Sequence, residues 1–387
     1  MNRIYMDNAS GAPVDERVID AMMSYMRTDV GNPASLHDSG INARRALATA
    51  RESVAFLIGA DENNIIFTSG GTESNNIALR GVAQRKKSKG KHVITTVIEH
   101  MSIINTCKDL QREGFEVSFV PVDKDGLVDV ERIEHEIRDD TILISVMYAN
   151  GEIGTIQPIR EIGEMAHKRE ILFHVDGVAA CGKIPIDVQK DNIDLLSISS
   201  NDLNGPKGVG ALYVGKGVPV RPVMTGGGQE KGIRSGSENI PGIAGFGKAC
   251  EIAKVEMDAD SSKMMEIRDR IIEKVLGNIK YSYITGHRTK RLPNIASMRF
   301  SFIEGESIIL GINDLGIEAS TGSACSVKTL QPSHVLMSIG LRHEEAHGSL
   351  LLSLNRWNTI EEANYIIENI PGVIDRLRML SPLYPGE

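Results

Sequence analysis

One cysteine lies in a segment of small and polar residues that could present a reactive thiol. Cys325 follows Ser-Thr-Gly-Ser-Ala at 320–324 and precedes Ser326. A cysteine taken at random is more often a buried, inert core residue. Flanking glycine and serine instead favour a mobile, exposed loop from which a thiolate can reach another site. We therefore take Cys325 as the first candidate for a chemically active group.

Two further segments have the residue types that bind a charged ligand. Gly70-Gly71-Thr72 follows an apolar run at 65–68 and opens a helical pattern at 73–86, so its N–H groups and hydroxyl could hold a phosphate. Asp176 ends an apolar run at 171–175, the place where open α/β sheets bind ligands. Taken alone, an ordinary glycine-rich turn and an aspartate that caps the next turn remain alternatives.

The elements that must position these residues alternate between strand and helix. We predict strands at 65–68, 92–97, 115–122, 142–148, 171–175, 195–199 and 209–214. Helices are predicted between them, for example at 73–86, 130–137 and 159–168. The nearly continuous apolar run at 142–147 is typical of a strand buried on both faces. This order predicts an α/β fold with a mostly parallel sheet covered by helices on both faces.

The pattern changes beyond residue 237, where a long charged helix is predicted at 243–276. Strand and helix then alternate less regularly, as at 295–302 and 361–377. We predict a large α/β domain at 14–255 that binds a cofactor. A smaller α+β domain is predicted from 1–13 and 256–387, and it carries the cysteine segment.

Composition excludes several other classes of protein. The 387 residues have a net charge of −8 and no long basic run, which argues against nucleic acid and anionic membrane partners. No apolar stretch approaches 18 residues, so we expect a cytoplasmic protein. The cysteines at 107, 181, 250 and 325 form no CxxC pair, so no disulfide framework or self-contained metal site is expected.

Together with two more segments, these motifs resemble the NifS/IscS-type cysteine desulfurases of aminotransferase class V. The added segments are Ser197–Gly210, with Gly-Pro-Lys-Gly at 205–208, and Gly226–Asn239. The resemblance covers essentially the whole chain. It implies a fold-type I pyridoxal phosphate enzyme, a homodimer and an IscU-type scaffold protein of iron–sulfur cluster assembly as partner.

The resemblance assigns roles to the positions that match. Cys325 corresponds to the cysteine that takes sulfur as a persulfide, and His100 to the histidine that stacks on the cofactor ring. Asp176 corresponds to the acid on the pyridine nitrogen. The expected phosphate ligands are Gly71, Thr72, Ser199 and, from the neighbouring subunit, Ser237.

Five positions depart from the family. Asn201 and Asp202 replace the histidine and the Schiff-base lysine, and a carboxylate forms no imine. Gly151 replaces an asparagine that touches cofactor and substrate, and Ala179 replaces a glutamine on the cofactor's phenolic oxygen. Leu351 replaces the arginine that grips the substrate carboxylate. Lys207 does not replace the lost lysine, because it matches the lysine of the family's own Gly-Pro-Lys-Gly loop.

Two functions remain open. The favoured one is a dimeric scaffold partner in iron–sulfur cluster assembly, with pyridoxal phosphate bound non-covalently, weakly or not at all. Cys325 would then accept sulfur from sulfide or a persulfide, or ligate a cluster shared with the partner protein. The alternative is a residual desulfurase that converts L-cysteine to L-alanine and a Cys325 persulfide, with His100 moving the protons. Another pyridoxal phosphate reaction such as transamination fits worst, because it needs the same lysine.

Overall fold

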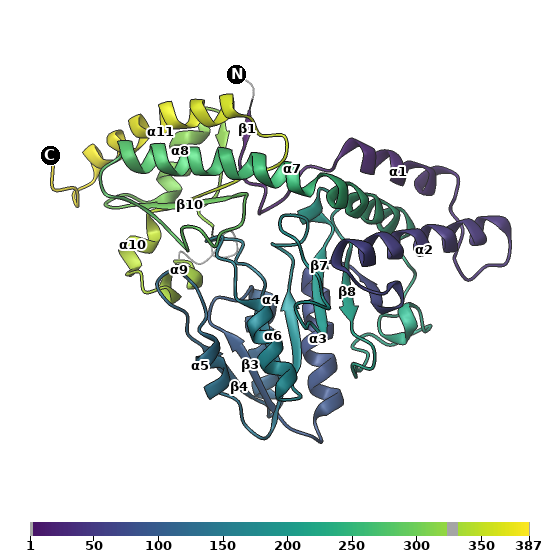
Figure 1. Cartoon of the computed structure of the whole chain (residues 1–387). Helices are drawn as coiled ribbons and strands as arrows, with labels where there is room; N and C mark the ends of the chain where they lie inside the picture. The colour runs from purple at the N-terminus through teal and green to yellow at the C-terminus, as the bar shows by residue number, and fades with distance from the viewer. Residues whose placement is uncertain (1–2, 323–331, 387) are drawn as a thin grey trace.

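The computed structural model describes residues 3–322 and 332–386, and its centre is a seven-stranded sheet (Figure 1). The strand order is β2-β8-β7-β6-β5-β3-β4. The neighbours β4-β3-β5-β6-β7 run parallel, whereas β8 runs antiparallel to both β2 and β7. The strands are β2 (Ile65–Thr68), β3 (His92–Thr96), β4 (Glu116–Val120), β5 (Thr141–Met147), β6 (Leu172–Asp176), β7 (Leu195–Ser199) and β8 (Gly210–Val214). The predicted α/β fold with a mostly parallel sheet is confirmed.

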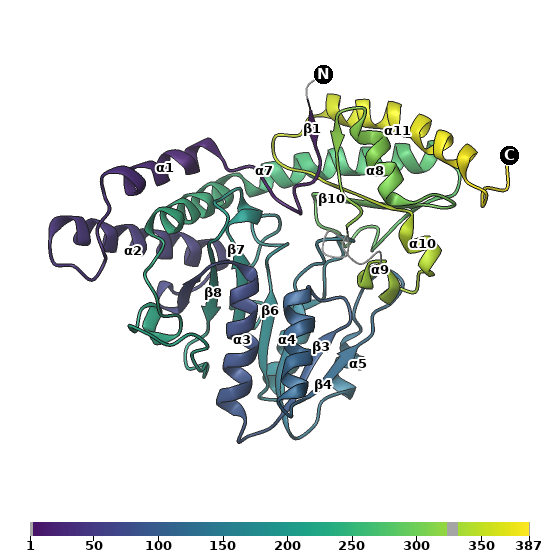
Figure 2. The same cartoon turned by 180° about the vertical axis from the view of Figure 1, so that it is seen from behind.

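Both faces of this sheet are covered because successive strand residues point to opposite sides. On β3, Val93 packs into one hydrophobic cluster and Ile94 into another. The first cluster includes residues of α3 (Gly71–Lys86) and α4 (Met101–Arg112), which lie in front of the sheet in Figure 2. The second includes residues of α2 (Asp38–Ile58) and α6 (Ile159–Lys168). The remaining helices of this part are α1 (Glu16–Arg27) and α5 (Val130–His135).

A second, smaller sheet forms from the C-terminal third of the chain. Its antiparallel order is β12-β10-β9, with β9 (Ser282–Ile284), β10 (Ile295–Phe300) and β12 (Ser349–Ser353). Near the N-terminus, β1 (Ile4–Tyr5) pairs in parallel with β11 (Ile317–Glu318). A separate hydrophobic cluster joins these strands to the longer helices. The helices here are α8 (Gly305–Asn313), α9 (His334–Ser338), α10 (His343–His347) and α11 (Ile360–Leu380).

One helix, α7 (Ile240–Asn278), connects the two parts without interruption (Figures 1 and 2). Its N-terminal half buries Phe246 in the large cluster and its C-terminal half buries Ile271 in the small one. The helix predicted at 243–276 is therefore confirmed. The predicted boundary between 255 and 256 falls inside α7, and the division into two domains stays a prediction.

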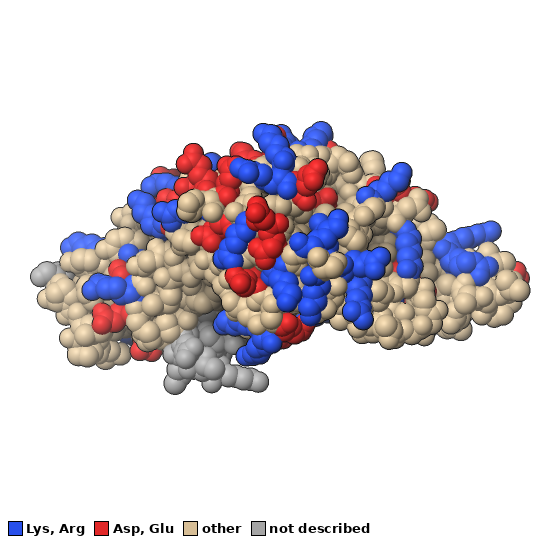
Figure 3. Space-filling view, turned by 90° about the horizontal axis from the view of Figure 1, so that it is seen from below, with Lys and Arg blue, Asp and Glu red and all other residues tan. Residues whose placement is uncertain are grey.

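Charged side chains of both signs lie side by side over the middle of the face seen in Figure 3. On that face the charges are therefore mixed rather than gathered in one acidic block. None of the helices in the described ranges combines the length and the apolar character needed to cross a membrane.

Candidate active site

The turn between β2 and α3 leaves the first N–H groups of α3 open. Gly70 is the N-cap residue, with φ 144° and ψ −176°, and no described side chain caps the helix there. A Cβ atom on Gly71 would lie 2.5 Å from Cγ2 of Val178, so only glycine fits without a shift. Free N–H groups at a helix start attract an anion. Gly71 and Thr72 therefore have the geometry expected of a phosphate cradle.

Two predicted site residues, His100 and Asp176, are joined by a chain of hydrogen bonds. Asn75 Nδ2 donates to Asp176 Oδ2 at 2.7 Å and to Ser102 Oγ at 2.9 Å. Ser102 Oγ in turn lies 2.7 Å from His100 Nδ1. The Val178 N–H donates to Asp176 Oδ1 at 3.1 Å. This network fixes the carboxylate at the end of β6, where only 6% of the residue is exposed.

Asn75 and Ser102 were not assigned roles from the sequence, although local signals for both exist. Asn75 follows Gly71 by four residues and so lies on the same face of α3. Ser102 is the second residue of α4, whose N-cap is His100. What the sequence could not indicate is that α3 and α4 pack side by side, since that contact is tertiary.

Two of the altered positions face each other. A Cβ atom built on Gly151 would lie 3.6 Å from the Cβ atom of Ala179. The asparagine and glutamine that the family has there would thus project into the same region. Replacing both by the two smallest residues removes polar groups from one side of the pocket.

Asp202 lies in the short 3₁₀ turn η2 (Asn201–Leu203), directly after β7. Its carboxylate accepts a hydrogen bond from Ser199, and burial raises its pKa to about 6. The charge of Lys183 and the hydrogen bond from Ser199 act against this rise, and the charge of Asp176 acts with it. The carboxylate therefore lies near Ser199 and close enough to Lys183 and Asp176 for their charges to act on it. The resemblance assigns Ser199 and Asp176 to the cofactor.

A lysine that sequence reasoning missed lies beside Asp202. Lys183 Nζ donates to the backbone carbonyl oxygen of Asp202 at 2.7 Å, and burial lowers the pKa of Lys183. Nineteen residues separate the two, so no local spacing could have indicated the contact. Lys207 points elsewhere: its Nζ would lie 3.0 Å from a Cβ atom on Gly11.

Leu351 lies on β12 but packs toward the large part of the molecule. Its neighbours Leu350 and Leu352 belong to the small hydrophobic cluster, whereas Leu351 belongs to the large one and is 3% exposed. Its backbone exchanges two hydrogen bonds with Ser320, at 2.7 and 3.2 Å. An apolar contact thus occupies the position where the family has a charged substrate clamp.

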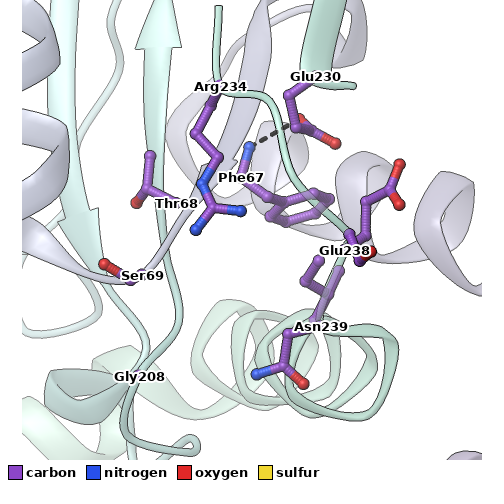
Figure 4. A pocket seen from close by; sticks show the side chains of 10 residues that line it. Phe67, Thr68, Ser69, Gly208, Glu230, Arg234, Glu238 and Asn239 are labelled. Atoms are coloured by element: carbon purple, nitrogen blue, oxygen red, sulfur yellow. Dashed lines mark hydrogen bonds between the residues drawn. The ribbon is translucent and has the colours of Figure 1, made fainter. Parts of the chain in front are cut away.

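Ser237 lines a pocket beside the cradle (Figure 4). Arg234 Nε lies 2.9 Å from Glu73 Oε1, and the Phe67 N–H donates to Glu230 Oε2 at 2.8 Å, as the dashed line shows. The pocket is lined by Phe67, Thr68, Ser69, Gly208, Glu230, Arg234, Ser237, Glu238, Asn239 and Ile243. The role of Ser237 toward a neighbouring subunit stays a prediction.

Cys325 lies outside the described residues, so its role as sulfur acceptor or metal ligand stays a prediction. On one side of that gap, Gly322 has a φ of 83°. On the other side, Ser333 Oγ donates to Glu152 Oε2 at 2.8 Å. The cysteines at 107, 181 and 250 are buried, and burial raises their pKa. These three thiols are therefore protonated and shielded.

The described residues contain no group of three histidine, cysteine or acidic side chains that could hold a metal ion. A cluster bound through Cys325 would thus need further ligands from another protein. The predicted ligand set, shared with a partner, stays a prediction.

Pyridoxal phosphate, which the resemblance implies, fits one half of this pocket and not the other. The open start of α3 suits the phosphate, and the fixed Asp176 carboxylate suits a protonated pyridine nitrogen. At the aldehyde end stands the Asp202 carboxylate, which cannot bond to a carbonyl carbon as an amine does. The same carboxylate also engages Ser199, an expected phosphate ligand. The described residues thus suit the phosphate and the pyridine nitrogen, and Asp202 itself offers no amine to an aldehyde.

Comparison with known proteins assigns the family. The aminotransferase class-V family matches residues 4–366, and the chain belongs to it. A cysteine desulfurase IscS 1 of Archaeoglobus fulgidus is 58% identical over 380 residues, which cover 98% of this chain and 99% of the relative. A cysteine desulfurase IscS of Methanosarcina thermophila is 50% identical, with 99% and 95% covered.

Solved structures agree with this assignment. A NifS-like protein matches with a TM-score of 0.91 at 39% identity, over 97% of this chain and 100% of that one. A NifS-like protein from Rickettsia africae matches with a TM-score of 0.87 at 31% identity, over 97% and 100%. The predicted relationship to the NifS/IscS-type desulfurases and the fold-type I architecture are both confirmed.

Proposed function

We propose that this chain acts in iron–sulfur cluster assembly as a dimeric scaffold partner with little cysteine desulfurase turnover. Cys325 is its working residue. The thiolate either takes the outer sulfur of a donor persulfide, which leaves the donor as a thiol, or supplies one ligand to a cluster. The remaining cluster ligands come from an IscU-type scaffold protein in the same cytoplasmic compartment.

The observation that carries this proposal is the Asp202 carboxylate in the pocket beside Ser199. Desulfurase chemistry needs an amine there, first to bond the cofactor and then to move the substrate's α-proton. Loss of a general base alone costs about 10² to 10⁴ in rate. The buried, apolar Leu351 adds to this, because it offers no charge to a substrate carboxylate.

We propose that the cofactor is held loosely when it is present. Gly71, Thr72 and Ser199 would hold the phosphate, Ser237 of a neighbouring subunit would complete it, and Asp176 would hold the pyridine nitrogen. When bound, pyridoxal phosphate supplies an electron sink. The contact of His100 with Ser102, which connects His100 to Asp176 through Asn75, supports the alternative of a residual desulfurase.

A turnover assay distinguishes the two functions. Purified protein supplied with pyridoxal phosphate and L-cysteine is expected to form alanine and sulfide at close to the rate of the cofactor alone. The Cys325→Ser variant serves as the control for thiol-dependent turnover. Alanine formation at a rate typical of an enzyme, about 1 s⁻¹ or more, would refute the scaffold proposal.

The scaffold role itself is tested by cluster assembly. With an IscU-type protein, ferrous iron and sulfide, the wild-type chain is expected to stabilise a cluster absorbance that Cys325→Ser reduces. Cys107→Ser is the matched control, since that thiol is buried. Equal absorbance with wild type and Cys325→Ser would contradict a ligand role.

A further inference from the structure

Two histidines lie one turn apart on the short helix α10. His343 is its first residue and His347 its last, so their side chains share one face of the helix. The centres of the two rings are 4.5 Å apart, and the ring planes are inclined by 57°. In the part of the chain that the structure describes, neither ring has a hydrogen-bond or ion-pair partner. Their nitrogens are therefore free to bind a ligand from solution.

The backbone that carries this pair is fixed by a residue between the two histidines. Glu345 Oε1 lies 3.3 Å from Arg299 Nη1 on β10. The other carboxylate oxygen of Glu345 accepts from the Arg342 N–H at 3.1 Å, which closes the first turn of the helix. His343 is exposed and His347 partly exposed, and α10 lies at the outer edge of the molecule in Figures 1 and 2. The pair is thus held on an ordered helix and remains open to solvent.

The spacing of the two rings suits a shared metal ion. The helix reads His-Glu-Glu-Ala-His, the spacing at which two histidines on one helix face bind zinc. A metal ion lies about 2.0–2.1 Å from an imidazole nitrogen and hence about 3.2 Å from the ring centre, so at a bond angle of about 90–110° two ring centres are about 4.5–5.2 Å apart. The observed separation of 4.5 Å falls at the lower end of that range. Imidazole ligands suit copper, nickel and zinc ions.

We propose that His343 and His347 together bind one divalent transition-metal ion, with Cu²⁺, Ni²⁺ and Zn²⁺ preferred over Mn²⁺ and Mg²⁺. The described residues offer no third histidine, cysteine or acidic ligand to such an ion, so water fills its other positions and the ion exchanges readily. A catalytic zinc has three protein ligands, and this site therefore binds metal without hydrolytic activity. Because neither Cys325 nor Asp202 takes part, metal binding here and the proposed function can each fail without the other.

Calorimetric titration of the full chain with Ni²⁺ and with Mn²⁺ at pH 7.5 tests this site. Every protein sample carries Cys325→Ser, since a thiolate would also bind such ions. We expect one Ni²⁺ ion per chain, bound at least about tenfold more tightly than Mn²⁺, in the order of stability that nitrogen ligands give to these metals. Absence of Ni²⁺ binding, or equal affinity for Ni²⁺ and Mn²⁺, would overturn the proposal.

Single variants show whether the two rings bind the same ion. His343→Asn and His347→Asn should each weaken Ni²⁺ binding at least about tenfold, equivalent to about 1.4 kcal/mol, because each removes one of two ligands. His135→Asn is the matched control, since His135 is exposed at the end of α5 and has no histidine four residues away. Its Ni²⁺ affinity should equal that of the parent chain. Unchanged Ni²⁺ affinity in either α10 variant, with circular dichroism matching the parent, would show that the rings do not share an ion and would refute the proposal.

Discussion

At the scale of single residues, substitution of a family position has two different consequences in this chain. Asp202 keeps its place facing the pocket and changes the charge there. Leu351 instead becomes part of the hydrophobic core, because alternation along β12 turns it toward the large cluster. If the predicted correspondence with the family holds, one replaced residue changes a charge and the other joins the hydrophobic core.

The packing role of Leu351 predicts a cost in stability. Leu351→Ala should lower the free energy of unfolding by about 2–5 kcal/mol, the usual range for a buried leucine. Leu310→Ala, at a leucine that is 68% exposed, is the matched control and should change it by less than about 0.5 kcal/mol. Urea denaturation measures both, and similar small losses would show that Leu351 is not part of the core.

At the scale of elements, the sheet holds polar groups in buried positions that only the fold explains. His174 Nδ1 lies 2.8 Å from Ser145 Oγ on β5, and its Nε2 lies 3.0 Å from Ser197 Oγ on β7. Burial lowers the pKa of His174 to about 3, so this histidine is neutral. His174 therefore connects β5, β6 and β7 through its hydrogen bonds with Ser145 and Ser197. It lies two residues before Asp176 on β6 and does not act as an acid–base group.

Glu99, between β3 and α4, predicts a dependence of stability on pH. Burial raises its pKa to about 8, and its Oε1 accepts from Thr96 and Met147. Because the folded state keeps a proton that the unfolded chain releases between about pH 4.5 and 8, stability falls as pH rises through that window. Glu99→Gln should remove this loss, which amounts to at most about 1.4 kcal/mol per pH unit.

Urea denaturation at pH 5.5, 6.5 and 7.5 checks this expectation. The stability of Glu99→Gln relative to wild type should increase with pH. Glu344→Gln, at an exposed position, should follow the wild-type curve. A difference between Glu99→Gln and wild type that stays constant with pH would mean that Glu99 is already ionised in the folded protein.

The sequence predicts the positions of helices and strands better than it predicts the contacts between them. The strands at 65–68 and 195–199 match the structure at both ends, since their apolar runs are bounded by turn residues. The phosphate turn and Asp176 were visible because each follows such a run directly. The contacts of Asn75 with Asp176 and of Lys183 with Asp202 were not visible, because they depend on how separate elements pack.

At the scale of the whole molecule, an ion-pair cluster joins the N-terminal segment, α7 and the C-terminal part. Arg356 is 10% exposed at its side chain and lies 2.7 Å from Glu256 and 3.1 Å from Asp260. It also lies 3.8 Å from Asp15. Arg17 pairs with both Asp15 and Glu256. One arginine thus lies close to three carboxylates, one from the N-terminal segment and two from α7.

Removing that arginine should destabilise the whole fold rather than one element. Arg356→Met is expected to cost roughly 1–3 kcal/mol, because partly buried carboxylates lose their partner. Arg112→Met, whose side chain is 78% exposed beside Asp109, should cost less than about 1 kcal/mol. Thermal unfolding followed by circular dichroism measures both variants, and equal midpoints would show that the cluster contributes no stability.

The pairing of the first strand also constrains how the chain matures on the ribosome. β1 pairs with β11, and Met6 accepts a backbone hydrogen bond from Ser353. At about 5–20 residues per second, roughly 20–70 s pass between the synthesis of Met6 and that of Ser353. During translation β1 therefore remains unpaired until β11 has been synthesised. The C-terminal sheet becomes complete only near the end of synthesis.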